Sequence, residues 1–264
     1  MKTFPSILLL FAALAAGPLN STAGAADAKT PPKIVFLVSE DPNNYEATRT
    51  VPVFAKMLTD KFGCKCQVIT GKGDPKAFSF PGLETIKDAD LLVVFFRRRA
   101  ISPEQYALIR NHLKAGKPLV GIRTANHAFS VQGDPAKGFE KWWEFVPEVL
   151  GCKNRGYGST ELGGDVAHVP AAAAHPILKG VAPDKWHTKG CIYLVAPMVD
   201  KKATVLMTAT TESKTEPVTW VRDCKGSRVF YTSLGYPGDF NLPQFRTMLT
   251  NGIFWAMKRP LPQK

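Results

Sequence analysis

The chain has 264 residues, 45% of them hydrophobic, five cysteines and a formal net charge of +12. This length is enough for one well-buried α/β domain, and five cysteines are too few for a disulfide scaffold. The charge suits an anionic partner such as a glycan or an envelope surface. The lysines are scattered without a nucleic-acid-binding motif, so we expect no nucleic-acid partner.

Residues 1–28 have the pattern of a secretory signal peptide. Lys2 precedes an apolar run from Ile7 to Ala16, and small residues at Ala23-Gly24-Ala25 and Ala26-Asp27-Ala28 offer two cleavage sites. We therefore expect a secreted or periplasmic protein whose residues 29–264 form a single domain. No later apolar stretch is long enough for a transmembrane segment.

The first half of the mature chain alternates strands and helices. Continuous apolar runs predict buried strands at 33–40, 64–70, 90–96 and 118–123. Helical spacing predicts a helix over 47–62 and a second that starts after the N-cap Ser102 and ends at Gly116, with His112 facing solvent. This alternation predicts a parallel sheet covered by helices on both faces.

The second half is richer in strands. A broad apolar stripe predicts a helix over 138–151, and the chain closes with a helix over 243–259. Between them we expect strands at 160–169, 191–197, 203–210, 216–223 and 227–235. The last pairs look antiparallel or mixed, which gives an α/β domain with a β-rich C-terminal portion.

Three predicted strand ends carry polar residues. The first strand ends at Glu40, the third at Arg97-Arg98-Arg99, and the fourth at "RTANH", residues 123–127. Ligands of open parallel sheets bind beyond the carboxyl ends of the strands, so we expect these groups to converge on one edge. Three consecutive arginines cannot all face the same way, and a single histidine is more often structural than functional.

The sequence lacks several common motifs of catalytic and cofactor-binding sites. The sequence has no G-x-S-x-G elbow, P-loop, G-x-G-x-x-G fingerprint or H-E-x-x-H zinc site. We predict no cofactor, although a divalent metal held by distant histidines stays open. Cys64 and Cys66 read as ordinary half-buried residues, and the pairing of the five cysteines is undetermined; their odd number leaves at least one thiol unpaired.

Four segments resemble the ThuA-like, or trehalose-utilisation, family. They are "KPLVGIRTANHAF" at 117–129, "HPILKGV" at 175–181, "PVTWVRDCKGSRVFYTSLGYPGDF" at 217–240 and "FRTMLTNGIFWAM" at 245–257. The resemblance covers essentially the whole mature chain in the right order. It implies a flavodoxin-like sheet flanked by helices, of the class I glutamine amidotransferase-like type.

The amidotransferase pattern differs from this chain at its nucleophile. Those enzymes carry G-x-C-x-G at the strand turn, whereas Gly121 to Ala125 places Arg123 at the cysteine position. A guanidinium stays protonated and is not a nucleophile, so we expect no glutamine amidotransferase activity. Two further departures from the ThuA-like pattern are Tyr236, where relatives often have histidine, and Gly190-Cys191, where many have an acidic pair.

The resemblance implies a small carbohydrate ligand, a disaccharide or keto-sugar derivative. We expect Arg123, His127 and Glu40 to be catalytic, by lyase, isomerase or hydrolase chemistry without a cysteine nucleophile. Residues expected to bind substrate are Arg97, Arg99, Thr124, Asn126, Trp186, His187, Tyr236 and Asp239. The alternatives are a non-catalytic sugar- or glycan-binding protein and a metal-dependent hydrolase; a homo-oligomer is compatible with either.

Overall fold

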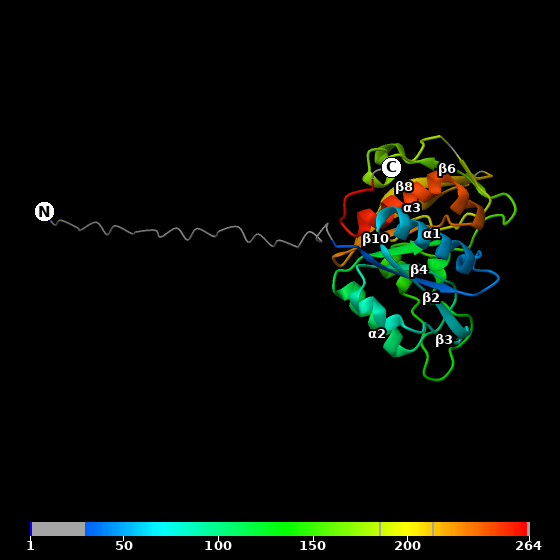
Figure 1. The fold of residues 1–264 in the computed structure, drawn as a ribbon. Helices are drawn as coiled ribbons and strands as arrows, with labels where there is room; N and C mark the ends of the chain where they lie inside the picture. The colour runs from blue at the N-terminus through cyan, green and yellow to red at the C-terminus, as the bar shows by residue number, and fades with distance from the viewer. Residues whose placement is uncertain (2–29, 185, 213, 263–264) are drawn as a thin grey trace.

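The computed structural model describes residues 30–262 apart from 185 and 213, together with Met1. The signal peptide expected at residues 1–28 lies outside the described residues, apart from Met1. Within the part described, the strands form one ten-stranded sheet in the order β3-β2-β1-β4-β5-β10-β9-β8-β6-β7. The predicted α/β class with a central sheet and flanking helices is confirmed (Figure 1).

The first half of the chain builds most of the parallel part of the sheet. Its elements are β1 (Lys33–Ser39), α1 (Ala47–Phe62), β2 (Lys65–Asp74), β3 (Ala77–Ser79), η1 (Leu83–Asp88), β4 (Leu91–Phe95), α2 (Pro103–Lys114), β5 (Leu119–Ile122) and η2 (Arg123–His127). Strands β2, β1, β4 and β5 run parallel, and β10 joins them beside β5. The chain leaves β1 for β2 on one side and later adds β4 on the other, so the strand order reverses between β1 and β4.

The second half extends the sheet with antiparallel strands. Its elements are η3 (Phe145–Leu150), β6 (Gly164–His168), η4 (Pro170–Ala172), η5 (Pro176–Leu178), β7 (Trp186–Thr188), β8 (Thr204–Thr211), β9 (Lys214–Cys224), β10 (Ser227–Thr232), η6 (Pro237–Asn241) and α3 (Pro243–Ala256). Each of the pairs β10–β9, β9–β8, β8–β6 and β6–β7 is antiparallel. This extension is the predicted β-rich C-terminal portion.

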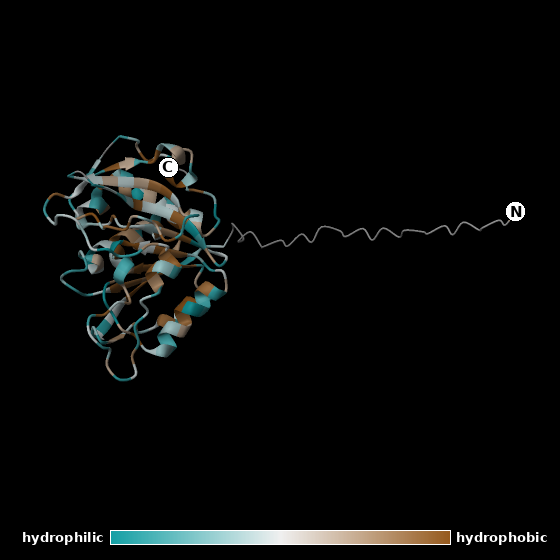
Figure 2. Cartoon of the chain, turned by 180° about the vertical axis from the view of Figure 1, so that it is seen from behind, coloured by the Kyte–Doolittle hydropathy of each residue, from teal (hydrophilic) through white to brown (hydrophobic). Residues whose placement is uncertain are grey.

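The central strands are buried on both faces, as their unbroken apolar runs predict. In β1, Ile34 and Phe36 pack with α1 and α3, whereas Val35 and Leu37 pack with α2 and η3 on the other face. Figure 1 shows α1 and α3 together and α2 apart from them. Along α2, hydrophobic and hydrophilic residues alternate, as expected of a helix with one face on the sheet (Figure 2).

Three predictions of local structure are wrong. Residues 191–197 form no strand, because Leu194 N–H donates to the Gly156 carbonyl and Glu216 accepts from the next two backbone N–H groups. Only Phe145–Leu150 of the helix predicted over 138–151 forms, because the N–H groups of Glu140 and Trp142 donate to other loops.

His112 is the third correction, because it is buried and does not face solvent. Its Nε2 lies 3.0 Å from the Pro118 carbonyl oxygen, which gives this polar ring a partner at the point where the chain turns from α2 into β5. Burial lowers the pKa of His112. The helix itself begins and caps as predicted, with the Ser102 side chain accepting from Gln105 N–H.

Candidate functional site

The carboxyl ends of β1, β4 and β5 converge on one edge of the sheet, next to the reversal of strand order. Backbone N–H groups of Arg98 and Arg99 donate to the His127 and Ala128 carbonyls, at 2.9 and 2.7 Å. The segment after β4 therefore lies against η2, which follows β5. The convergence predicted from the sequence is confirmed for these two strand ends, and Asp41, which follows β1, joins them through an ion pair to Arg99.

Asn44 holds the three strand ends together. It is fully buried, and its Nδ2 donates to the Ser39 carbonyl at 3.1 Å and to the Phe95 carbonyl at 3.0 Å. Its Oδ1 accepts from Thr124 Oγ1 at 2.7 Å. One amide thus bonds to the ends of β1, β4 and the start of η2. Thr124, which we expected to bind substrate, instead donates its hydroxyl hydrogen bond to Asn44 within the protein.

Three cavities open at this edge. The first, here called the central cavity, has a volume of about 380 Å³ and is lined by Pro42, Asn43, Tyr45, Arg97, Arg98, His127, Gln132, Asn154, Gly156, Tyr157, Thr160 and Tyr193. The Asp41 cavity, of about 480 Å³, is lined by Asp41, Asp74, Pro75, Lys76, Arg97, Arg98, Arg99, Val131 and Gln132. The Trp143 cavity, of about 460 Å³, is lined by Arg98, Asn126, His127, Ser130, Trp143, Val146, Pro147, Lys153, Asn154 and Gly156. Arg98 is common to the linings of all three cavities.

His127 lies between the central cavity and the Trp143 cavity. Its Nδ1 is 2.5 Å from Asn126 Oδ1, and Asn154 Nδ2 lies 3.1 Å from the same nitrogen. An amide oxygen only accepts, so the short contact with Asn126 puts the proton on Nδ1 and leaves Nε2 as the acceptor. The Asn154 amide then donates to Asn126 Oδ1, at 3.4 Å, rather than to the ring. Burial, together with the positive charges of Arg98 and Arg97, lowers the pKa of His127 to about 3, so the ring is neutral at physiological pH.

The three arginines after β4 have three different environments. Arg99 is buried, donates to Asp41 at 2.9 Å and lies over the Phe78 ring. Arg97 is 3.7 Å from the other Asp41 carboxylate oxygen. Arg98, at a left-handed φ of 51°, has no ion pair among the described residues and lines all three cavities. From the sequence we expected Arg97 and Arg99 to bind substrate and did not single out Arg98.

Arg123 occupies a different position from the one expected. Its side chain is 1% exposed and is not among those lining the cavities. The guanidinium lies 3.8 Å from the centre of the Tyr45 ring and 5.0 Å from that of Tyr193, and it donates to the Ser233 carbonyl at 2.9 Å. Since both rings line the central cavity, Arg123 stands behind its aromatic wall.

The remaining expected site residues lie apart from the cavity linings. Glu40 is exposed, while its neighbour Asp41 pairs with the arginines. Trp186 is in the core, and His187 pairs with Asp165 at the outer edge of the sheet. Asp239 accepts from Thr188 Oγ1 and from the N–H groups of Gly235 and Tyr236; burial raises its pKa, and these bonds oppose the rise.

Four cavity residues were not found from the sequence. Tyr193 and Tyr157 meet through an isolated bridge, and Tyr157 is 60% exposed beside the central cavity. Asn154 reaches His127, and Trp143 is 54% exposed at the third cavity. Trp143 and Tyr193 lie where the sequence predicted a helix and a strand that the structure does not form, and Asn154 and Tyr157 lie in irregular chain. The aromatic residues at 143 and 157 are the one signal that could have drawn attention to them.

A metal site was left open by the sequence. Across the described residues, no group of three or more histidine, cysteine or acidic side chains is placed to hold a metal ion.

Among the residues that the structure describes, no helix is long and apolar enough to cross a membrane. All five cysteines are free.

The fold is that of a flavodoxin-like α/β protein, with cavities beyond the carboxyl ends of its parallel strands. The family model described as trehalose utilisation, ThuA, matches residues 34–256. Because this match spans most of the sequence, the chain belongs to the ThuA family, which confirms the resemblance drawn from the sequence.

Solved structures agree with this family. A ThuA-like protein from Parabacteroides merdae superposes with a TM-score of 0.63 at 16% identity, covering 89% of this chain and 93% of that one. One from Bacteroides uniformis gives 0.61 at 16% identity, covering 88% and 94%. At this identity the likeness shows the fold alone. The comparison with curated proteins gives no match.

Proposed function

We propose that the protein binds a carbohydrate in the central cavity and moves a proton on the carbon next to a sugar carbonyl. The family, described by trehalose utilisation, suggests a carbohydrate-related role. The observation that carries the finer proposal is the pairing of a neutral His127 with the cationic Arg97 and Arg98 on one cavity. Such a pairing places a proton acceptor beside an oxyanion-stabilising charge. The negative oxygen of an enolate would neutralise the arginine charge that lowers the pKa of His127, so the ring can take up a proton as that oxygen forms.

The reaction would proceed without a covalent intermediate. His127 Nε2 takes the proton from the carbon, and the C–H electrons move to form an enolate whose negative oxygen is stabilised by Arg97 or Arg98. Where that carbon carries a hydroxyl group, transfer of the hydroxyl proton to the former carbonyl oxygen and return of the first proton to the former carbonyl carbon gives isomerisation. Expelling a leaving group, with its electron pair, from the carbon on the other side of the enolate gives elimination. Neither course needs a cofactor. The Asn126 amide oxygen, which accepts from His127 Nδ1–H, holds the imidazole tautomer that this step requires.

The lining also bears on the type of chemistry. Most glycoside hydrolases use two carboxylates on either side of the bond. The described residues that line the central and Trp143 cavities include no carboxylate, which supports proton transfer over that route. The exposed rings of Tyr157 and Trp143 are suited to stack on sugar rings.

The test is exchange of the substrate's carbon-bound hydrogen in D₂O, followed by NMR on a panel of disaccharides and their 3-keto forms. Exchange reports proton removal whichever product forms. We expect His127→Gln to slow exchange by about 10²–10⁴-fold while keeping the ligand-induced rise in melting temperature. Binding without exchange by the unaltered protein would reject the enzyme and favour a non-catalytic sugar-binding protein.

We also propose that the chain is exported. The support is the signal-peptide pattern of residues 1–28. Expression of the full chain with its N-terminus intact, followed by mass measurement of the periplasmic or secreted protein, should show a mature start near Ala26 or Lys29. Full-length protein retained in the cytoplasm would refute export.

A further inference from the structure

The central and Trp143 cavities are lined by cationic side chains and by no acidic one among the described residues. Among the described lining residues, Arg97, Arg98 and Lys153 are cationic, no residue is acidic and His127 is neutral. Acidic residues appear only in the adjoining Asp41 cavity. There Asp41 is bonded to Arg99, and Asp74 accepts from the backbone N–H of Lys76.

Arg98 lines the cavities without a carboxylate partner among the described residues. Its Nε is buried without a hydrogen-bond partner among the described residues, and burial together with Arg97 lowers its pKa. A partly desolvated guanidinium without a carboxylate is costly, and an anion in the cavity would offset that cost. Its neighbours Arg97 and Arg99 already share Asp41.

The backbone at Arg98 is held in an unfavourable shape. A φ of 51° at a non-glycine residue is uncommon and costs free energy, and strained residues of this kind cluster at functional sites. The bond from Arg98 N–H to the His127 carbonyl, 2.9 Å long, fixes the residue in this shape. The result is that Arg98 reaches all three cavities while its neighbours turn to Asp41.

We propose that the site selects an anionic carbohydrate, one bearing a carboxylate or phosphate group, and that Arg98 is its principal anion ligand. This rests on the proposed carbohydrate site. A guanidinium presents paired N–H donors that match two oxygens of either anion. The cavities, at about 380 and 460 Å³, are of a size suited to a small sugar.

The test compares neutral and charged sugars of matched shape by isothermal titration calorimetry. The pairs are lactose with lactobionate, for the carboxylate, and trehalose with trehalose 6-phosphate, for the phosphate. These probes have no keto group to react, so their binding is independent of the proposed proton transfer. We expect at least one charged member to bind about tenfold or more tightly than its neutral partner.

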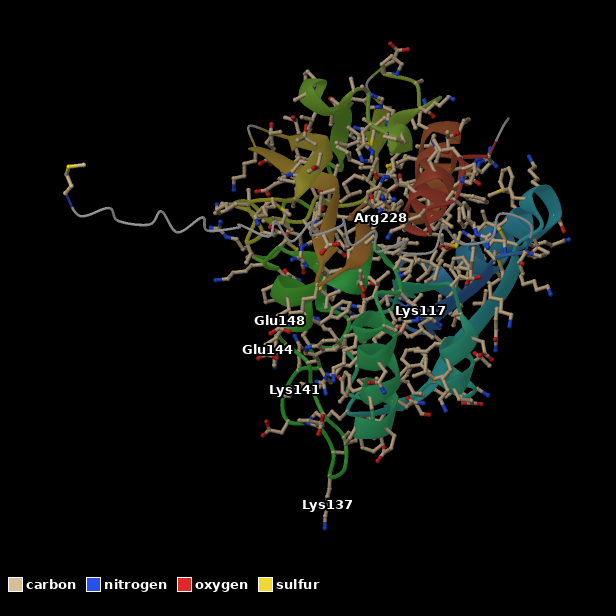
Figure 3. The ribbon with its side chains drawn as sticks, turned by 90° about the vertical axis from the view of Figure 1, so that its left-hand side faces the viewer. Lys117, Lys137, Lys141, Glu144, Glu148 and Arg228 are labelled. Carbon is tan, nitrogen blue, oxygen red and sulfur yellow. The ribbon has the colours of Figure 1, made fainter. Side chains whose placement is uncertain are left out.

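Substitutions of Arg98 test whether this residue causes the preference for the charged sugar. Arg98→Met should abolish the preference for the charged sugar, because it weakens binding of the charged member much more than binding of the neutral one. Arg98→Lys, which keeps the charge and loses the paired donors, should retain part of the preference. The matched control is Lys117→Met, which removes one positive charge at the amino end of β5, the opposite edge of the sheet (Figure 3). It should change neither affinity.

Each remaining outcome has a separate meaning. Equal binding of neutral and charged sugars, or equal loss of both in Arg98→Met, overturns the anion preference. Failure of all four probes to bind overturns the carbohydrate site on which it rests. If the unaltered protein shows the charge preference but catalyses no deuterium exchange, only the proton-transfer chemistry is refuted. Circular dichroism of each variant separates loss of binding from loss of fold.

Discussion

The side chain of His127 illustrates how a residue's surroundings set its charge. Its pKa of about 3 lies well below the ordinary value near 6.5, because burial and two neighbouring arginines oppose protonation. Below pH 6.5 the unfolded chain therefore binds a proton here that the folded chain does not. Stability linked to this residue is fully present above pH 6.5 and falls as the pH drops toward 3.

This linkage can be measured with His127→Gln. Between pH 7.5 and pH 5, the free energy of unfolding of the unaltered protein should decrease more than that of the variant, which lacks the titrating ring. Urea unfolding at both pH values measures the difference, and His112, also buried, contributes equally to both proteins. Parallel losses in the two proteins would contradict the assignment.

Asn44 is expected to be a main support of the site. Replacing it by alanine leaves the Ser39 and Phe95 carbonyls and the Thr124 hydroxyl without their partner in a fully buried place. We expect Asn44→Ala to lower the free energy of unfolding by about 2–4 kcal/mol. Asn43→Ala, at the exposed neighbour, is the control and should cost about 0.5 kcal/mol or less in the same urea titration.

At the scale of elements, local hydrophobic patterns were sufficient to predict several strands of the sheet. The strands at 33–39, 91–95 and 119–122 are confirmed, and their continuous apolar runs match burial on both faces of the sheet. The order of these strands then places their carboxyl ends together. Residues 191–197 are equally apolar, but Glu216 and Gly156 supply their backbone partners, which no local pattern reveals.

The same limit applies to the candidate site. That three arginines could not face one way was predictable, but the choice of Arg98 depends on a left-handed backbone held by a bond to His127. Likewise Arg123 was predictable as a strand-end residue, whereas its enclosure by Tyr45 and Tyr193 depends on segments 78 and 70 positions away in the chain. Tertiary contacts, which local sequence patterns do not show, determine the positions of both Arg98 and Arg123.

The packing of α3 on β10 supplies a prediction for elements. A Cβ on Gly252 of α3 would overlap the Phe230 ring of β10, with 2.8 Å to its Cζ. Gly252→Ala should therefore lower the free energy of unfolding by about 1–3 kcal/mol, despite the better helix propensity of alanine. Chemical denaturation is the measurement, and Gly252→Ala combined with Phe230→Leu should recover part of the loss.

The control for this prediction is Gly238→Ala, since a Cβ there meets nothing within 4 Å. That variant should unfold within about 0.5 kcal/mol of the unaltered protein. If Gly252→Ala is as stable as the control, α3 can move away from the sheet more freely than close packing allows.

At the scale of the whole molecule, the cysteines bear on how the protein is stabilised. All five are free, and four are buried, although export would expose the chain to an oxidising compartment. We expect the melting temperature of purified protein to be the same with and without dithiothreitol. A melting temperature that falls on reduction would show a bridge that the structure lacks.

The bonds made by Asn44 have a further consequence for molecular recognition. Because one buried amide joins the ends of two strands to the following turn, the walls of the central cavity are set before any ligand arrives. A preformed site loses little conformational entropy when it is occupied. Discrimination between sugars should then depend on how well each fits a fixed shape, rather than on how far the protein can adapt to it.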